Sequence, residues 1–300
     1  MGSNKIIENE AMLTEVVKAA FDRTDNPRLK EIMAAFVDHA HAFVRAVDLT
    51  EEEFEFGLRF IAAIGQANTD RHNEAVLAAD VLGISTLVSL RNNPQDQGQT
   101  AAALLGPFWR LNAPKCKNGE SIARSATPGQ TLLVSGQVKS IDGLPIAGAQ
   151  VDVWQASPVG LYENQDPQQA EMNLRGLFCS DLDGRYHFRT VRPAGYPVPT
   201  HGPVGTLLAA QNRHPYRPAH VHFMVSAPGY KTMTTQVFMD EPEKLASDVV
   251  FGVVKSLVAN LERHDSFEPL PSGASLPIYT LEYDFTLSEG EQTFPEPPIK

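Results

Sequence analysis

The chain has 300 residues, of which 42% are hydrophobic and 20% are charged. This composition is typical of a globular protein with enough apolar material for a core, and the length suits one large domain or two smaller ones. The formal net charge of -11 at pH 7 disfavours nucleic acids and anionic membrane surfaces as partners.

Targeting signals are not evident in the sequence. No apolar run is long enough to cross a bilayer, and residues 1–5 lack the apolar core of a signal peptide. Cys116 and Cys179 form no paired-cysteine motif, so we expect reduced thiols. Together these features predict a cytoplasmic protein.

The N-terminal part of the chain has the apolar periodicity of helices. Apolar residues recur at helical spacing from Leu29 to Ala40. Asp48 and Thr50, followed by glutamates at 51–53, predict the capped and acidic first turn of a second helix. A third helix is expected over about residues 71–90, and the polar segment 92–99 is typical of a linker.

After this linker the pattern changes to short β-rich runs separated by Gly, Pro and Asp. The expected strands are residues 131–138, 150–154, 186–191, 219–225 and 234–238. Such a succession predicts a β-sandwich. We therefore expect an α+β chain with a helical domain at residues 1–100 and a mostly antiparallel β-sandwich domain at residues 101–300.

Two further segments have distinct patterns. Residues 192–218 are rich in Pro and Gly and have little periodicity, which predicts a long loop of the kind that is often functional. Residues 249–263 have the spacing of a single helix that returns to the sandwich.

The most informative short motif is His220-Val221-His222, within an expected strand. Side chains alternate between the two faces of a strand, so both imidazoles point the same way and can share one metal ion. The sequence contains neither the His-Glu-x-x-His motif of zinc hydrolases nor the paired cysteines of structural zinc sites. A site of two histidines and one carboxylate, typical of non-haem Fe(II) oxygenases, stays open at this point.

Tyrosine is the alternative source of further ligands. Tyr162 and Tyr196 both lie in loop-like stretches beside glycine. Phenolate is a hard anionic oxygen donor that suits Fe(III), but a free phenol has a pKa of about 10 and ionises at neutral pH only beside a bound cation.

The combined motifs resemble the intradiol ring-cleavage dioxygenase family over most of the chain. The segments that carry the resemblance are Asp80-Val81-Leu82-Gly83, Leu105-Gly106-Pro107-Phe108, Gly160-Leu161-Tyr162, Gly195-Tyr196-Pro197-Val198-Pro199, Gly202-Pro203-Val204-Gly205, Arg213-His214-Pro215-Tyr216-Arg217-Pro218-Ala219-His220-Val221-His222-Phe223, Ser226-Ala227-Pro228-Gly229-Tyr230 and Thr234-Thr235-Gln236.

The resemblance implies that Tyr162, Tyr196, His220 and His222 bind one Fe(III) per subunit. It gives Tyr196 the role of the ligand that a bound diol displaces, and the departing phenolate then takes a substrate proton. Arg217 is expected to stabilise negative charge on the substrate ring, and Gln236 to support the site. His201 and His214 match no ligand position, and we interpret both as structural.

Within the family, Ser247–Val253 and Phe223–Ser226 resemble the enzymes that open hydroxyquinol (benzene-1,2,4-triol). Leu105 is more like the catechol enzymes, and His201 stands where many relatives have Asp. Catechol and chlorocatechol 1,2-dioxygenases are therefore the alternative. Asp80 is a candidate acceptor for the third hydroxyl of hydroxyquinol.

The resemblance also implies the walls of a substrate pocket. The expected lining residues, besides Arg217, are Leu77, Asp80, Leu104, Leu105, Gly106, Pro107, Phe108, Val198 and Pro199.

The partners implied by the resemblance are a small aromatic diol or triol, O2 and a second copy of the chain. In the family the N-terminal helices join a homodimer and can hold a lipid between them. Two alternatives without this chemistry are a structural zinc protein that uses His220 and His222, and a partner-binding sandwich with a helical dimerisation module.

Overall fold

The structure is a computed structural model that describes residues 6–69, 72–269, 274 and 276–298. Residues 1–5, on which the expected location partly rests, and residues 70–71, at the expected start of the third helix, lie outside the described residues. The described chain divides into two compact units, one on each side of the boundary between Ala62 and Ala63.

The α-helices are Leu13–Ala20 (α1), Pro27–Ala46 (α2), Glu51–Gln66 (α3), Glu74–Val81 (α4), Ile84–Asn92 (α5), Pro203–Ala210 (α6) and Pro242–Leu245 (α7), with short 3-10 helices at Glu10–Met12, Phe21–Arg23, Glu163–Gln165 and Lys255–Leu257. The strands are Thr131–Ser140 (β1), Gln150–Gln155 (β2), Arg175–Cys179 (β3), Arg185–Val191 (β4), Tyr196–Pro197 (β5), Tyr216–Arg217 (β6), His220–Ser226 (β7), Met233–Phe238 (β8), Glu262–His264 (β9), Ile278–Glu282 (β10) and Phe285–Leu287 (β11).

Local capping explains where the first long helices begin. Asn26 accepts a hydrogen bond from Leu29 N, and Pro27 follows it in the first turn of α2. At the start of α3 the Glu53 carboxylate accepts from Thr50 N at 3.0 Å, while Glu53 N donates to Thr50 Oγ1 at 3.3 Å. This reciprocal pair is a capping box, and it confirms the helix start that the sequence predicts.

The single third helix expected over residues 71–90 is wrong, because two helices occupy this segment. Helix α4 ends at Val81, and Gly83 then adopts φ 71° before α5 begins at Ile84. This left-handed conformation costs glycine little and interrupts the helical hydrogen-bond ladder.

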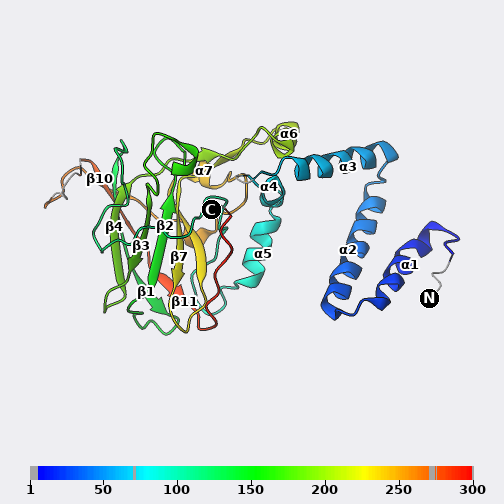
Figure 1. The fold of residues 1–300 in the computed structure, drawn as a ribbon, viewed down its shortest axis with the longest axis horizontal. Coiled ribbons are helices and arrows are strands. Elements are labelled where there is room, and N and C mark those ends of the chain that lie inside the picture. The colour runs from blue at the N-terminus through cyan, green and yellow to red at the C-terminus, as the bar shows by residue number, and fades with distance from the viewer. Residues whose placement is uncertain (1–5, 70–71, 270–273, 275, 299–300) are drawn as a thin grey trace. The chain divides into compact units, whose positions relative to one another are not determined.

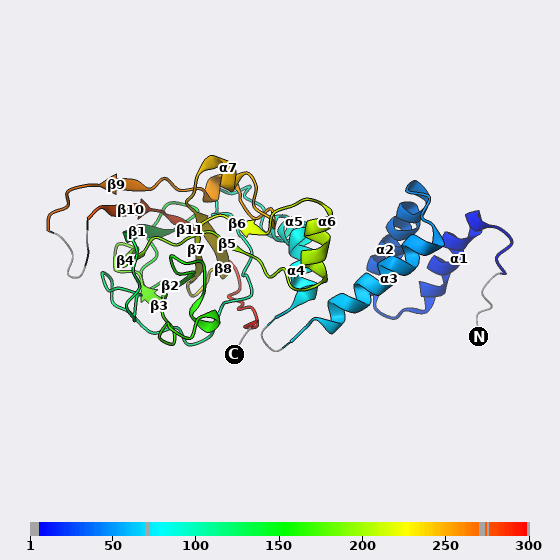
Figure 2. The same cartoon turned by 90° about the horizontal axis from the view of Figure 1, so that it is seen from above.

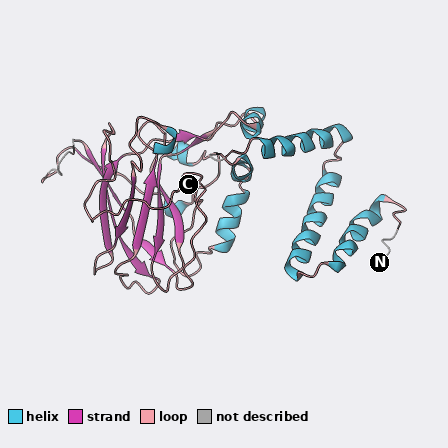
Figure 3. Ribbon diagram, in the orientation of Figure 1, coloured by secondary structure: helices cyan, strands magenta, loops and turns pink. Residues whose placement is uncertain are grey.

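The remainder of the second unit is built on two β-sheets (Figure 1). One sheet contains β11, β1, β10 and β9, with β4 paired to β1; the other has the order β3-β2-β7-β8. Strand β1 pairs in parallel with β10 and β11 and antiparallel with β4, and the second sheet is antiparallel throughout. Helices α4, α5 and α6 lie together beside these strands in both views (Figures 1 and 2), and Figure 3 separates the two kinds of element by colour. The expected sandwich is confirmed.

Strand β7 is buried along its whole length and shows why the site forms on this sheet. Val221, Phe223 and Val225 join the main core between the sheets. The alternate residue Met224 packs on the opposite face with Trp154 and Tyr162, in a separate aromatic cluster. By the same alternation, His220 and His222 face that cluster.

Two other expectations are corrected. Residues 249–263 do not form one helix: Val249 and Val250 pack against α4 and α6 residues in an apolar cluster, a 3-10 turn spans Lys255–Leu257, and β9 pairs with β10. The segment 192–218 is more than a loop, since it contains β5, α6 and β6. The apolar residues Val204 and Leu208 bury one side of α6.

None of the described helices is both long and apolar enough to span a membrane.

Gly136 of β1 provides a test of the sandwich packing. A Cβ at this position would overlap Tyr283 O and lie 2.9 Å from the Tyr186 hydroxyl. We expect Gly136→Ala to lower the free energy of unfolding by about 1–3 kcal/mol or more, measured by chemical denaturation. The matched change Gly65→Ala, in α3 with nothing within 4 Å, should instead stabilise by about 0.5–1 kcal/mol. Equal effects would contradict this packing.

Candidate active site

The two histidines of β7 meet at their ring edges. Their Nε2 atoms lie 3.2 Å apart, and the side chains are almost completely buried. The antiparallel register places His222 between Trp154 of β2 and Gln236 of β8. The Trp154 and His222 rings are stacked, with centroids 4.8 Å apart and planes 12° apart. The neighbouring strands therefore hold the His222 ring in place.

The two tyrosines reach the same point from other segments. Tyr162 immediately precedes the 3-10 helix Glu163–Gln165, and Tyr196 begins β5. Their hydroxyl oxygens are 3.4 Å apart, and the Tyr196 hydroxyl is 3.4 Å from His220 Nε2. Side chains from three separate segments of the sequence thus bring their donor atoms together.

One hydrogen bond decides which nitrogen of His220 has the lone pair that can bind a cation. His220 Nδ1 lies 2.7 Å from Pro218 O, a carbonyl that can only accept. Nδ1 therefore carries the proton, and the lone pair of His220 is on Nε2, facing the other donors. Within the described structure His222 Nδ1 is buried without a hydrogen-bond partner.

The electrostatics of this cluster suit a positive ion. Burial, reinforced by the Arg217 charge, lowers the pKa of His220 to about 3, and burial holds the pKa of His222 well below its usual value. Both rings are therefore neutral at pH 7. Burial also raises the pKa of Tyr162 well above 10, so that phenol ionises only beside a cation.

The tyrosines are necessary to complete a ligand set. Among the residues that the structure describes, no group of three or more His, Cys, Asp or Glu side chains can hold a metal ion. A centre with two histidines and one carboxylate therefore finds no support in the described part of the chain. Two neutral imidazoles and two phenols give a mixed nitrogen and oxygen donor set that suits a hard trivalent cation.

A short two-stranded ribbon brings Arg217 beside this cluster. Arg217 of β6 pairs with Tyr196 of β5, and its Nη1 lies 3.4 Å from His220 Nε2. The guanidinium is held by the Asp248 carboxylate and by Gln236, whose own Nε2 donates to Leu104 O. Sequence reasoning placed Gln236 near the site but missed Asp248.

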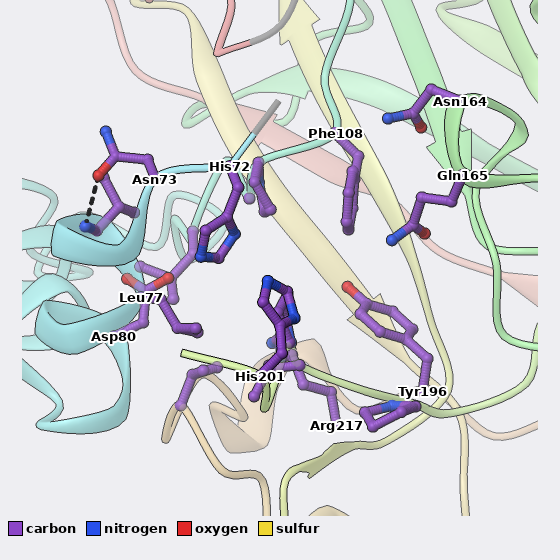
Figure 4. Close-up of a pocket in the computed structure, with 18 residues that line it drawn as sticks. His72, Asn73, Leu77, Asp80, Phe108, Asn164, Gln165, Tyr196, His201 and Arg217 are labelled. Carbon is purple, nitrogen blue, oxygen red and sulfur yellow. Dashed lines mark hydrogen bonds between the residues drawn. The ribbon is translucent and has the colours of Figure 1, made fainter. Parts of the chain in front are cut away.

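A cavity of about 260 Å³ lies beside this cluster and is lined by its members Tyr196 and Arg217, while His220 and His222 lie behind the lining (Figure 4). Leu77 and Asp80, from α4, lie across it from Phe108 and Tyr196. The expected residues that line it are Leu77, Asp80, Leu104, Gly106, Pro107, Phe108, Val198, Pro199 and Arg217. Gly106 adopts φ 73° and approaches His222 so closely that a Cβ would lie 3.1 Å from its Cε1 atom.

Other side chains do not follow the expected pattern. Leu105 is not in the lining and packs instead against the aromatic cluster of Phe108, Tyr162 and Tyr196. His201, interpreted from the sequence as structural, lies in the pocket wall with His72. His214 does lie outside the pocket lining, and its Nδ1 accepts from Tyr216 N.

Asp80 is the acidic group in the pocket lining. Burial raises the pKa of its carboxyl, while a hydrogen bond with Ser85 opposes that change. The local pairing considered for Asp80 is therefore present, and the carboxyl still faces the pocket.

Comparisons with known proteins agree with this geometry. Residues 104–289 match the family described as Dioxygenase, and residues 26–100 match the Catechol dioxygenase N terminus. The chain belongs to the intradiol ring-cleavage dioxygenase family. This membership makes the structural zinc and binding-module alternatives wrong. The boundary expected at residue 100 stays a prediction, because the contacts divide the chain at residue 62.

Similar relatives act on different diols. The chain is 40% identical to a hydroxyquinol 1,2-dioxygenase of Rhizobium sp., over 93% of this chain and 95% of the relative. It is 39% identical to a catechol 1,2-dioxygenase of Candida albicans, over 92% and 91%. The solved hydroxyquinol 1,2-dioxygenase of Pseudomonas putida DLL-E4 matches with a TM-score of 0.87 and 40% identity, covering 94% of this chain and 99% of that one.

The donor cluster leads to a direct prediction about metal binding. We expect His220→Ala to weaken binding of one Fe(III) per chain by at least about 100-fold, because a ligand is lost from a buried set. Metal analysis after iron loading and dialysis measures this. The control His214→Ala should retain one equivalent, and a fully loaded His220→Ala protein would contradict the assignment.

Proposed function

We propose that this chain opens the ring of hydroxyquinol between its two adjacent hydroxyl-bearing carbons with O2 and yields maleylacetate (3-hydroxy-cis,cis-muconate). The observation that carries the proposal is the buried convergence of Tyr162, Tyr196, His220 and His222 beside a pocket. The proposed cofactor is one Fe(III) per subunit, held by these four side chains.

The donor chemistry fits this cofactor. Two ionised phenols supply negative charge and two neutral imidazoles add none, which favours the ferric over the ferrous state. A bound Fe(III) supplies Lewis acidity that holds the deprotonated diol and makes its ring reactive toward O2.

The structure supports different roles for the two tyrosines. Tyr196 lines the pocket, whereas Tyr162 does not. The Phe108 ring stacks on Tyr162 with a centroid distance of 4.4 Å and covers it. Tyr196 is therefore the phenolate that a diol in the pocket would reach, and its oxygen would accept a diol proton. Tyr162 stays in place.

Arg217 lies in the pocket wall with its charge directed toward the donor cluster. A fixed cation in a water-poor pocket stabilises negative charge that develops on the substrate ring. The apolar walls at Leu77, Phe108 and Val198 limit the access of water. Gln236 acts through Arg217 by fixing the guanidinium plane.

The first experiment for this function is oxygen uptake by the iron-loaded chain with hydroxyquinol and with catechol. A higher kcat/KM for hydroxyquinol, with maleylacetate as product, is the expected result. The His220→Ala protein corrects for spontaneous oxidation of hydroxyquinol. A preference for catechol would be consistent with ring cleavage but would contradict hydroxyquinol as the substrate. Leu105, beside the aromatic cluster, would then be the first residue to substitute.

Asp80 is the proposed acceptor for the third hydroxyl. Asp80→Ala should lower kcat/KM for hydroxyquinol at least about tenfold more than for catechol, because a buried hydrogen-bond partner is lost. The same kinetic ratio for His201→Ala is the matched control, because His201 also lines the pocket. Equal losses for both substrates in Asp80→Ala would reject this role, and a selective loss in His201→Ala would assign recognition to His201.

We further propose a cytoplasmic homodimer joined through its N-terminal helices, with a lipid between them, and a helical domain that extends to residue 100. The exposed side chains of Phe36, Phe43, Phe54 and Ile61 support an apolar contact on these helices.

The free thiols of Cys116 and Cys179 are compatible with a reducing compartment.

A further inference from the structure

The guanidinium of Arg217 has most of its donors already assigned. Its Nε donates to Asp248 Oδ1 at 3.1 Å, and its Nη2 donates to Asp248 Oδ2 at 3.2 Å and to Gln236 Oε1 at 2.8 Å. An arginine has five N–H groups, so the two that remain belong to Nη1. Nη1 is the nitrogen that lies 3.4 Å from His220 Nε2.

Asp248 is in turn fixed from the other side. Its Oδ2 accepts from Gly252 N at 2.9 Å, and both Asp248 and Arg217 are about 5% exposed. Gly252 approaches so closely that a Cβ there would lie 3.0 Å from Arg217 Nη2. The backbone thus encloses the ion pair and leaves the guanidinium little freedom to rotate.

The loop that carries Asp248 is also anchored to the pocket wall. Arg213 donates to Val249 O at 2.7 Å and to Val81 O at 2.8 Å, which ties the loop to the end of α4. Thr86 of α5 donates to Val250 O, and Val250 itself lines the pocket. Asp248 is therefore a rigid point of attachment.

We propose that Asp248 is a positioning residue for the ring-cleavage reaction: it aims the Nη1 donors of Arg217 at the substrate and balances the Arg217 charge beside the metal ligands. This role rests on the proposed function. In a buried site the positive charges of Arg217 and a metal cation would repel each other. The ionised Asp248 carboxylate offsets this repulsion. The bidentate geometry also sets which edge of the guanidinium faces the pocket.

The test is a double-mutant cycle with the full-length, iron-loaded chain. Asp248→Asn keeps the shape but removes the charge, and it should lower kcat by about 10- to 100-fold, while KM for hydroxyquinol changes less than about threefold. In the Arg217→Lys background, Asp248→Asn should lower kcat by less than about twofold more, because the side chain that it positions is already gone.

The control is Asp284→Asn, which also removes the charge of a hydrogen-bonded carboxylate. Asp284 accepts hydrogen bonds from Lys139 Nζ and Gln137 N, and none of these three residues lines the pocket. Asp284→Asn should leave kcat unchanged. Gly252→Ala is the second variant: it retains the Asp248 charge but presses on Arg217 Nη2, and it should also lower kcat at full iron content.

The outcomes separate this inference from the function on which it rests. A wild-type protein that opens no diol ring would end the proposed function and this inference together. With an active wild type, three results would overturn the positioning role alone: Asp248→Asn indistinguishable from Asp284→Asn, an equal loss in the Arg217→Lys background, or a loss fully explained by missing iron.

Discussion

The alternation of side chains along the buried strand β7 is the constraint on which the rest of the structure depends. One face of this strand supplies Val221, Phe223 and Val225 to the core between the sheets, and the other presents His220 and His222. A slip of one residue would exchange the two sets, placing imidazoles in the core and valines in the pocket. Pairing with both β2 and β8 prevents such a slip, so the sandwich and the proposed metal ligands are specified by the same register.

The charged and ionisable groups of the site also depend on one another. The donor cluster contains neutral imidazoles, a phenol that burial keeps protonated and a buried arginine. Burial of these polar groups costs free energy unless the ring donors bind a cation and the arginine pairs with a carboxylate. Burial alone would lower the pKa of Arg217, but Asp248 raises it above its usual value, and Arg217 in return lowers the pKa of the Asp248 carboxyl. The polar groups around the pocket therefore form one connected electrostatic unit, to which the proposed metal cation would add the remaining positive charge.

Much of this arrangement can be predicted from the sequence, because its signals are local. The His-x-His spacing, the main strands and the capping of α3 each depend on neighbouring residues. What the sequence does not reveal depends on distant partners: Asp248 meets Arg217 across 31 positions, and Val249 and Val250 leave the helical pattern because they pack against α4 and α6. His201 reaches the pocket through the placement of α6 and the segment before it, which no periodicity indicates.

We propose above all that two tyrosinates and two histidines bind Fe(III) beside this pocket. The most direct test is the visible absorption spectrum of the chain loaded with one equivalent of Fe(III), recorded for the wild type, Tyr162→Phe and Tyr196→Phe. We expect a broad tyrosinate-to-iron charge-transfer band that changes in both variants. In the wild type, diol added without O2 should also perturb this band. A loaded wild type without such a band, or a band that neither substitution alters, would contradict this proposal.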